Sequence, residues 1–196
     1  MGSLVSFNKA CESLFDLKTS SNAKVFIETG CFRGKSLEFA LQTGFDFCYS
    51  CDVDQEMIDH CKDTLNYNNF EIHLADSVSF LDSLLPRLSD QDSIIFFLDA
   101  HLPGHDKKAQ YSDIVLTEQT FPLERELDVI FKHRQNKTDV IICDDLRIYE
   151  DGPFTGGVWH DRHQFNLNLD FIEKYPATYK KYYADEGYIV LTGTES

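Results

Sequence analysis

Short apolar runs alternate along the chain with stretches in which apolar residues recur at helical spacing. Runs such as 94–98 and 140–143 contain no alternating polar positions, which is typical of parallel strands covered on both faces. The runs predict strands at 24–28, 46–52, 70–75, 93–99 and 139–144. The periodicity elsewhere predicts helices at 7–18, 35–43, 55–66, 77–86, 118–133 and 161–174.

The last part of the chain breaks this alternation. Two strand-like runs, 178–184 and 187–192, are separated only by Asp185 and Glu186. So short a link permits an antiparallel hairpin, because a parallel pair needs a crossover connection. The whole pattern predicts an α/β fold: a doubly wound, Rossmann-like sheet of five parallel βα units closed by a C-terminal antiparallel hairpin.

Residues 1–23 are predicted to form a helical segment that packs on the core. Within the helix expected at 7–18, the apolar side chains that share one face are Phe7, Cys11, Leu14 and Phe15. Residues 24–196 are predicted to be a single domain, since a chain of 196 residues suffices for one sizeable core and no linker divides it.

Charge and composition argue against several classes of partner. The net charge of −15 disfavours nucleic acid, because phosphate contacts need clustered Lys and Arg. No apolar stretch approaches the roughly 20 residues of a membrane span, so no membrane partner is expected. The N-terminal residues lack a secretory signal pattern, which predicts a cytoplasmic protein with reduced cysteines. The oligomeric state stays open, a homodimer included.

A turn with two glycines follows the first predicted strand. Residues 28–36 read Glu-Thr-Gly-Cys-Phe-Arg-Gly-Lys-Ser, immediately before a helical pattern. Gly30 and Gly34 let a ligand approach bare backbone beside a helix N-terminus, and in open α/β sheets this crevice is the usual binding site. The spacing differs from the GxGxxG of dinucleotide-binding proteins, so the turn alone predicts only a nucleotide-like ligand.

Acidic residues recur where the predicted strands end. The series is Glu28, Asp52, Asp76, Asp99 and the pair Asp144-Asp145. A single Asp at such a place is often a helix cap or a turn residue. Capping alone does not require an acid at every strand end, so the series predicts one acidic edge of the sheet.

Two of these acids lie near the glycine turn in the predicted fold. Asp52, followed by Val53, is placed to accept both hydroxyl groups of a ribose. Asp76, followed by Ser77, is placed to accept a hydrogen bond from an adenine amino group. The alternative is that Asp76 or Ser77 caps the helix that begins there, and the two interpretations are compatible.

Asp99, Asp144 and Asp145 are predicted to meet at neighbouring strand ends, about 4.8 Å apart. Three clustered carboxylates repel one another, and a shared Mg²⁺ ion with oxygen ligands would resolve the conflict. The alternative is a salt-bridge cluster with Arg147 or Lys107.

In this order, the segments resemble the class I S-adenosylmethionine-dependent methyltransferases. The nearest resemblance is to cation-dependent O-methyltransferases, such as catechol O-methyltransferase and the macrocin-type sugar O-methyltransferases. The loop at 28–36 matches their acid-x-Gly-x-x-x-Gly-x-Ser pattern, and 51–54, 74–77, 98–101 and 143–145 are similar to their ribose, adenine and metal-binding strand ends. The resemblance runs from about residue 24 to 146 and implies their seven-stranded fold.

The resemblance also implies cofactors and a reaction. S-adenosylmethionine would be bound by Glu28, Gly30, Cys31, Phe32, Gly34, Ser36, Asp52, Val53, Asp76 and Ser77. A divalent cation, Mg²⁺, would be bound by Asp99, Asp144 and Asp145. The reaction would be metal-assisted O-methylation of a small-molecule acceptor, such as a sugar or phenol hydroxyl.

The catalytic base departs from the family pattern. Catechol-type enzymes carry a lysine three residues after the first metal aspartate, where this chain has Leu102. Macrocin-type enzymes have an acid two residues after it, where this chain has His101. An imidazole can take a hydroxyl proton near neutral pH, so His101 beside Asp99 is the predicted catalytic pair, with a structural histidine as the alternative.

Other functions fit single features of the sequence. Asp52-Val53-Asp54 is a DxD-like pair that would suit a metal-dependent nucleotide-sugar glycosyltransferase, although the glycine turn would then be unexplained. A non-catalytic nucleotide-binding domain of the same fold is a further alternative. His101 and His105 with Asp99 would imitate a two-histidine, one-carboxylate iron site, which is a minor alternative.

Overall fold

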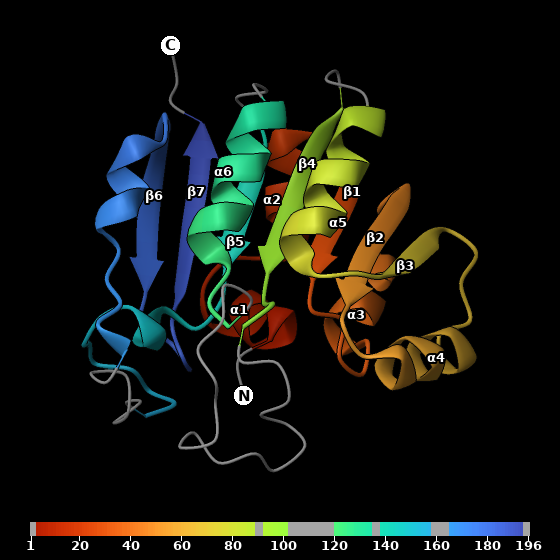
Figure 1. Cartoon of the computed structure of the whole chain (residues 1–196), viewed down its shortest axis with the longest axis horizontal. Coiled ribbons are helices and arrows are strands. Elements are labelled where there is room, and N and C mark those ends of the chain that lie inside the picture. Colours follow the sequence, from red (N-terminus) through yellow and green to blue (C-terminus); the bar gives the residue numbers. More distant parts are fainter. Residues whose placement is uncertain (1–2, 89–91, 102–119, 135–137, 158–164, 194–196) are drawn as a thin grey trace.

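The computed structural model describes residues 3–88, 92–101, 120–134, 138–157 and 165–193. Its centre is one seven-stranded sheet in the order β3-β2-β1-β4-β5-β7-β6 (Figure 1). The strands are β1 (Ala23–Thr29), β2 (Phe47–Asp52), β3 (Phe70–Leu74), β4 (Ser93–Leu98), β5 (Val140–Cys143), β6 (Ala177–Tyr182) and β7 (Tyr188–Gly193). Strands β1 to β5 pair in parallel, whereas β7 is antiparallel to both β5 and β6. The predicted doubly wound sheet with a closing hairpin is confirmed.

Helices cover both faces of the sheet. They are α1 (Leu4–Ala10), α2 (Leu14–Ser21), α3 (Lys35–Thr43), α4 (Gln55–Thr64), α5 (Ser77–Leu84) and α6 (Leu123–His133). Figure 1 shows α5 and α6 in front of the sheet, and α1 to α4 contribute to the core on the other face. Successive strand residues point to opposite faces, so Ile27 packs in the α5–α6 layer and Phe26 in the layer of α1 to α4.

The carboxyl ends of the parallel strands meet at one edge. Leu98 of β4 is level with Thr29 of β1 and with Cys143 of β5, so the residues that follow them are also neighbours. The backbone continues this pairing: Asp99 N donates to Thr29 O at 3.1 Å, and Asp144 N donates to Leu98 O at 3.0 Å. The predicted acids of β4 and β5 are therefore brought together by the ladder itself.

The prediction of one helix at 7–18 is wrong, because two helices, α1 and α2, occupy this region. Ser13 starts the second helix by accepting a hydrogen bond from Asp16 N, and Asn8 accepts one from Leu14 N. The break turns Phe15 outward, where it is 61% exposed, while Leu14 stays fully buried. The local capping interaction therefore overrides the apolar spacing.

The helix predicted at 161–174 is also wrong for its described part. No described residue of this segment is α-helical: Phe165 and the short helix η6 (Asp170–Lys174) have 3₁₀ geometry, and residues 166–169 between them are not helical. Asn168 accepts a hydrogen bond from Asp170 N, a local turn that competes with an α-helix. Helix α6 begins at Leu123 rather than 118, because Pro122 precedes it as the cap; residues 102–119 lie outside the described part.

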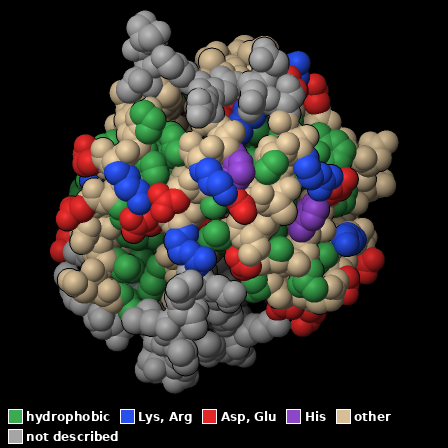
Figure 2. Space-filling view, turned by 45° about the horizontal axis from the view of Figure 1, so that its top comes forward, with side chains coloured by type: hydrophobic (Ala, Val, Ile, Leu, Met, Phe, Trp, Pro, Cys, Tyr) green, Lys and Arg blue, Asp and Glu red, His purple; other side chains and the backbone are tan. Residues whose placement is uncertain are grey.

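Figure 2 shows a face on which basic and acidic side chains lie side by side. Among the ion pairs of the described residues are Lys24 with Asp92 at 3.0 Å and Lys132 with Asp82 at 2.8 Å. No single-sign block covers this face. No described helix combines the length and the apolar character needed to cross a membrane.

Candidate active site

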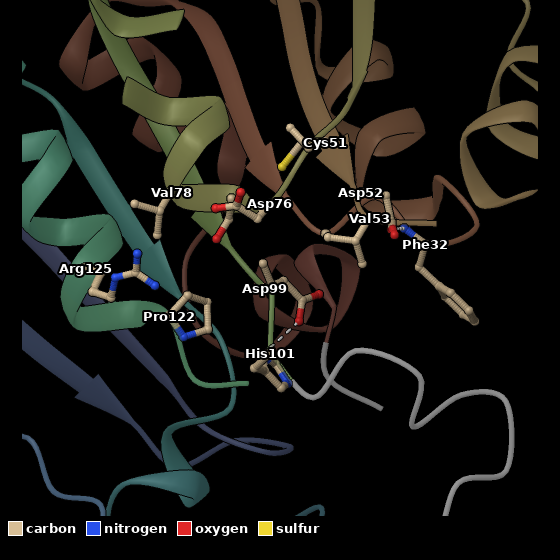
Figure 3. Close-up of a pocket in the computed structure, with 14 residues that line it drawn as sticks. Phe32, Cys51, Asp52, Val53, Asp76, Val78, Asp99, His101, Pro122 and Arg125 are labelled. Carbon is tan, nitrogen blue, oxygen red and sulfur yellow. Dashed lines mark hydrogen bonds and ion pairs between the residues drawn. The ribbon is translucent and has the colours of Figure 1, made fainter. Parts of the chain in front are cut away.

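A cavity of about 700 Å³, partly open to solvent, lies at the carboxyl edge of the sheet. Of the predicted site residues, those that line it are Gly30, Phe32, Asp52, Val53, Asp76, Ser77, Asp99 and His101. Figure 3 shows Asp52 and Val53 on one side of the cavity, Val78 and Arg125 on the other, and Asp99 with His101 between them.

The glycine turn is shaped by left-handed backbone. Gly30 and Gly34 have φ angles of 84° and 73°, and Phe32 between them has 42°. A Cβ on Gly30 would lie 2.7 Å from the carbonyl oxygen of Asp99, so only glycine lets the turn approach the end of β4. The N–H groups of Gly30 and Cys31 both donate to Cys51 O, at 3.0 and 2.9 Å, which ties the turn to β2.

Asp52 is held in a fixed orientation at the cavity wall. One carboxylate oxygen accepts a hydrogen bond from Phe32 N, and the other accepts one from Asp54 N, both at 2.9 Å. Asp54 itself caps α4 by accepting from Glu56 N at 2.9 Å, and it does not line the cavity. The DxD interpretation is therefore weakened, because the second acid serves the helix.

Asp76 occupies both of the places predicted for it, the cap of α5 and the wall of the cavity. Its Oδ1 caps α5 by accepting from Ser79 N at 3.0 Å, and the residue also lines the cavity. Partial burial opposes ionisation, but the bonds from Ser79 and the charge of Arg125 lower the pKa of Asp76. Both the capping and the cavity-wall interpretations agree with the geometry.

Four predicted cofactor residues do not line the cavity, and they lie behind the turn instead. Glu28 is buried and accepts a hydrogen bond from Ser50 at 2.7 Å; burial raises its pKa to about 8. Ser36 accepts from Leu4 N at 3.2 Å, so its hydroxyl faces α1. The other two are Cys31, whose sulfur is 3.9 Å from that of Cys61, and Gly34, which packs against the same thiol.

The acids at the ends of β4 and β5 are paired with cationic side chains. His101 Nε2 is 2.6 Å from Asp145 Oδ2, and His101 Nδ1 is 3.6 Å from Asp99 Oδ1. Arg147 Nε is 3.3 Å from Asp145 Oδ1, and Arg147 also pairs with Glu186. Asp145 therefore lies between two positive groups.

The pKa values follow from this arrangement. Burial, and then the neighbouring Asp144 and Asp145, raise the pKa of Asp99; burial and Asp145 do the same for Asp144. Burial also opposes ionisation of Asp145, yet His101 and Arg147 lower its pKa. Burial alone would lower the pKa of His101, but Asp145 overrides it, and the net effect is a raised pKa.

This arrangement does not fit the predicted Mg²⁺ site. Among the described residues, no three His, Cys, Asp or Glu side chains are grouped so that they could hold a metal ion. Both oxygens of Asp145 already face His101 or Arg147. The structure contains the alternative, a salt-bridge cluster with Arg147; Lys107, and His105 of the iron interpretation, lie outside the described residues.

The sequence analysis missed the contribution of α6. Pro122 and Arg125 line the cavity, and Glu126 is buried beside it, only 2% exposed. The signal was the spacing: positions 122, 125 and 126 share one face of a helix that begins at the acidic edge.

No protein-family model matches the chain, and no curated protein sequence matches it. Several solved structures, in contrast, match most of the chain. The Podospora anserina methyltransferase PaMTH1, bound to S-adenosylhomocysteine, is 14% identical with a TM-score of 0.63, over 92% of this chain and 76% of that one. An O-methyltransferase from Bacillus cereus in complex with S-adenosylhomocysteine is 15% identical, TM-score 0.56, over 92% and 79%. An rRNA methylase from Streptococcus thermophilus is 11% identical, TM-score 0.52, over 92% and 94%.

The chain has the fold of the class I methyltransferases. This confirms the fold that the sequence segments implied. Because the similar structures include both O-methyltransferases and an rRNA methylase, the fold does not decide which acceptor is methylated.

Proposed function

We propose that this protein is an S-adenosylmethionine-dependent methyltransferase that acts on an oxygen atom of a small acceptor. The observation that carries the proposal is one cavity that is lined both by Gly30, Asp52 and Asp76 and by Asp99 and His101. Gly30, Asp52 and Asp76 would suit a nucleoside. Asp99 and His101 would suit a proton transfer beside the positively charged sulfur of the cofactor. Structures of the same fold that hold S-adenosylhomocysteine support this assignment.

The cofactor half of the cavity has the chemistry of a nucleoside site. Asp52, oriented by two backbone N–H groups, would accept hydrogen bonds from the ribose hydroxyls, and Asp76 would accept one from the adenine amino group. Val53 is half-exposed and faces Val78 across the cavity, so the two would pack on the faces of the adenine ring. When bound, S-adenosylmethionine supplies an electrophilic methyl group on a cationic sulfur.

The acidic half would receive the acceptor and its proton. Asp145 accepts a hydrogen bond from Nε2–H of His101, so that Nδ1, on the side of Asp99, would take the hydroxyl proton when the imidazole is neutral. Because the pKa of His101 is raised, this neutral form grows as the pH rises. Asp99 would attract the cationic sulfur and help to align the acceptor oxygen for in-line attack. No step in this proposal is assigned to a metal ion, because the residues do not fit one.

Calorimetry with two ligands tests the proposed class. We expect the full chain to bind S-adenosylhomocysteine with micromolar affinity and a uridine diphosphate sugar much more weakly. The reverse preference would support the glycosyltransferase interpretation instead. Formation of S-adenosylhomocysteine in the presence of an acceptor then separates an enzyme from a non-catalytic binding domain.

A further inference from the structure

A second, smaller cavity lies beside the candidate cofactor cavity. The two share Ala100, His101 and Pro122, so the small one adjoins the proposed reaction site. Its other walls are the acids Glu126 and Asp144 together with Leu98, Leu123 and Tyr149. The enclosed space accommodates roughly one water-sized group. It is therefore suited to one small polar group rather than to a ring.

Of the residues that line this cavity, Glu126 is the one with a buried polar atom that lacks a hydrogen-bond partner within the described residues. The side chain is 98% buried, and the hydroxyl groups of Ser77 and Thr29 form hydrogen bonds to its carboxyl group. Its Oε1 has no hydrogen-bond partner within the described residues. A buried carboxylate oxygen left unpaired is unfavourable by about 1–3 kcal/mol, so the atom marks the place of a missing donor.

The walls define the chemistry of that donor. Glu126 and Asp144 both line the cavity, and their carboxyl groups accept hydrogen bonds when ionised. Burial raises the pKa of Glu126 to about 7, and a cation bound beside it would favour the ionised form. Anions are repelled, and a hydroxyl group offers a single proton. A primary ammonium group has the size of a water molecule, carries three donors, and neutralises part of the acidic cluster.

We propose that this cavity binds the primary ammonium group of the methyl acceptor. The acceptor is then an amino alcohol or amino phenol, rather than a phosphorylated or coenzyme A-linked molecule. With the ammonium group held by Glu126 and Asp144, a hydroxyl group a few atoms away reaches the cofactor side of His101. This inference rests on the proposed function for the identity of the second ligand.

The test uses the full chain saturated with S-adenosylhomocysteine, with that binding measured first. Failure to bind S-adenosylhomocysteine overturns the proposed function, whereas the next step concerns the small cavity alone. Methylammonium chloride is then titrated by thermal shift, with tetramethylammonium chloride at equal ionic strength as the control. We expect saturable stabilisation by methylammonium only, because four methyl groups leave no N–H donor. Equal effects of the two salts overturn the ammonium subsite and leave a water in the cavity.

A matched pair of variants locates the effect. Glu126→Gln removes the charge with little change of shape and should weaken methylammonium binding at least about tenfold, the loss expected for one charge-assisted hydrogen bond. Glu124→Gln makes the same change two residues earlier on α6, where the side chain is 51% exposed and pairs with Lys174, and should leave the affinity unchanged. Equal affinities of Glu126→Gln and wild type contradict the proposal. If Glu126→Gln does not fold, the comparison of the two salts on the wild-type chain still decides.

Discussion

The two halves of the carboxyl edge hold their acids in different ways. In the cofactor half, at the ends of β1, β2 and β3, Asp52 and Asp76 accept hydrogen bonds from backbone N–H groups. In the acidic half, at the ends of β4 and β5, Asp144 accepts one backbone hydrogen bond, from Asp145 N at 2.8 Å, but Asp145 is held by the side chains of His101 and Arg147. Backbone donors do not titrate or change rotamer, whereas side-chain partners do both.

The difference assigns different tasks to the halves. Carboxylates held by the backbone keep their charge and direction before any ligand arrives, which suits recognition of one invariant cofactor. A cluster balanced by His101 and Arg147 rearranges when a proton or a cationic ligand enters. Under the proposed function, we therefore expect the acidic half to be the part that responds to the acceptor.

The largest expected effect tests the contact between the two halves, where the glycine turn packs against the end of β4. Gly30→Ala places a Cβ 2.7 Å from Asp99 O, and its φ of 84° is strained for alanine. We expect the free energy of unfolding to fall by roughly 3–5 kcal/mol in urea titrations. Gly44→Ala, at a φ of 83° with nothing within 4 Å, is the control and should lose only about 1–2 kcal/mol. Equal losses would mean that the turn does not press against β4.

Glu28 sharpens the comparison, because it lies in the cofactor half without a backbone donor. Burial raises its pKa from 4.5 to about 8, so the folded chain keeps a proton that the unfolded chain has lost in this range. The free energy of unfolding therefore falls as the pH rises from about 4.5 to 8. Glu28→Gln cannot ionise and should remove roughly 2–4 kcal/mol of that decline, measured as unfolding at pH 5 and pH 8. The exposed Glu38→Gln should keep the wild-type slope.

The next effect concerns the rigid recognition by Asp52. Asp52→Ala removes the acceptor of two backbone bonds and of the proposed ribose hydroxyls, so S-adenosylhomocysteine should bind roughly a hundredfold more weakly. Calorimetry on this variant is compared with Asp59→Ala, an exposed position on α4 that does not line the cavity. If Asp52→Ala binds S-adenosylhomocysteine as tightly as the wild type does, Asp52 does not take part in recognising the cofactor.

The features that could be predicted from the sequence lie mostly in the cofactor half, and those that could not lie mostly in the acidic half. The strands, the glycine turn and the cap at Asp76 depend on neighbours in the chain, and their patterns were readable. The two helix predictions that were wrong, at 7–18 and 161–174, also concern local structure. In each case the hydrogen bond of one side chain, Ser13 or Asn168, outweighed the apolar spacing.

The partners in the acidic half were harder to predict, because His101 and Asp145 meet only through the fold. Asp145 pairs with His101, 44 positions earlier in the chain, and Arg147 reaches Glu186 in the turn before β7. The cluster of acids could be inferred from the strand ends. Whether a metal ion or basic side chains of the chain itself balance its charge could not be inferred from the sequence. Glu126 escaped notice because burial, not sequence pattern, distinguishes it from Glu124.

The smallest expected effect is the response to a chelator, which tests whether the acidic half is internally balanced. Since Oδ2 of Asp145 pairs with His101 and Oδ1 lies 3.3 Å from Arg147 Nε, we expect EDTA to change the rate of methyl transfer by less than about twofold. Arg147→Met is the informative companion, because it leaves Asp145 and Glu186 without that cation and should create a site at which added Mg²⁺ raises the melting temperature. Loss of wild-type activity in EDTA with recovery in Mg²⁺ would contradict internal balance, and the acids of β4 and β5 would then have to rearrange around the ion.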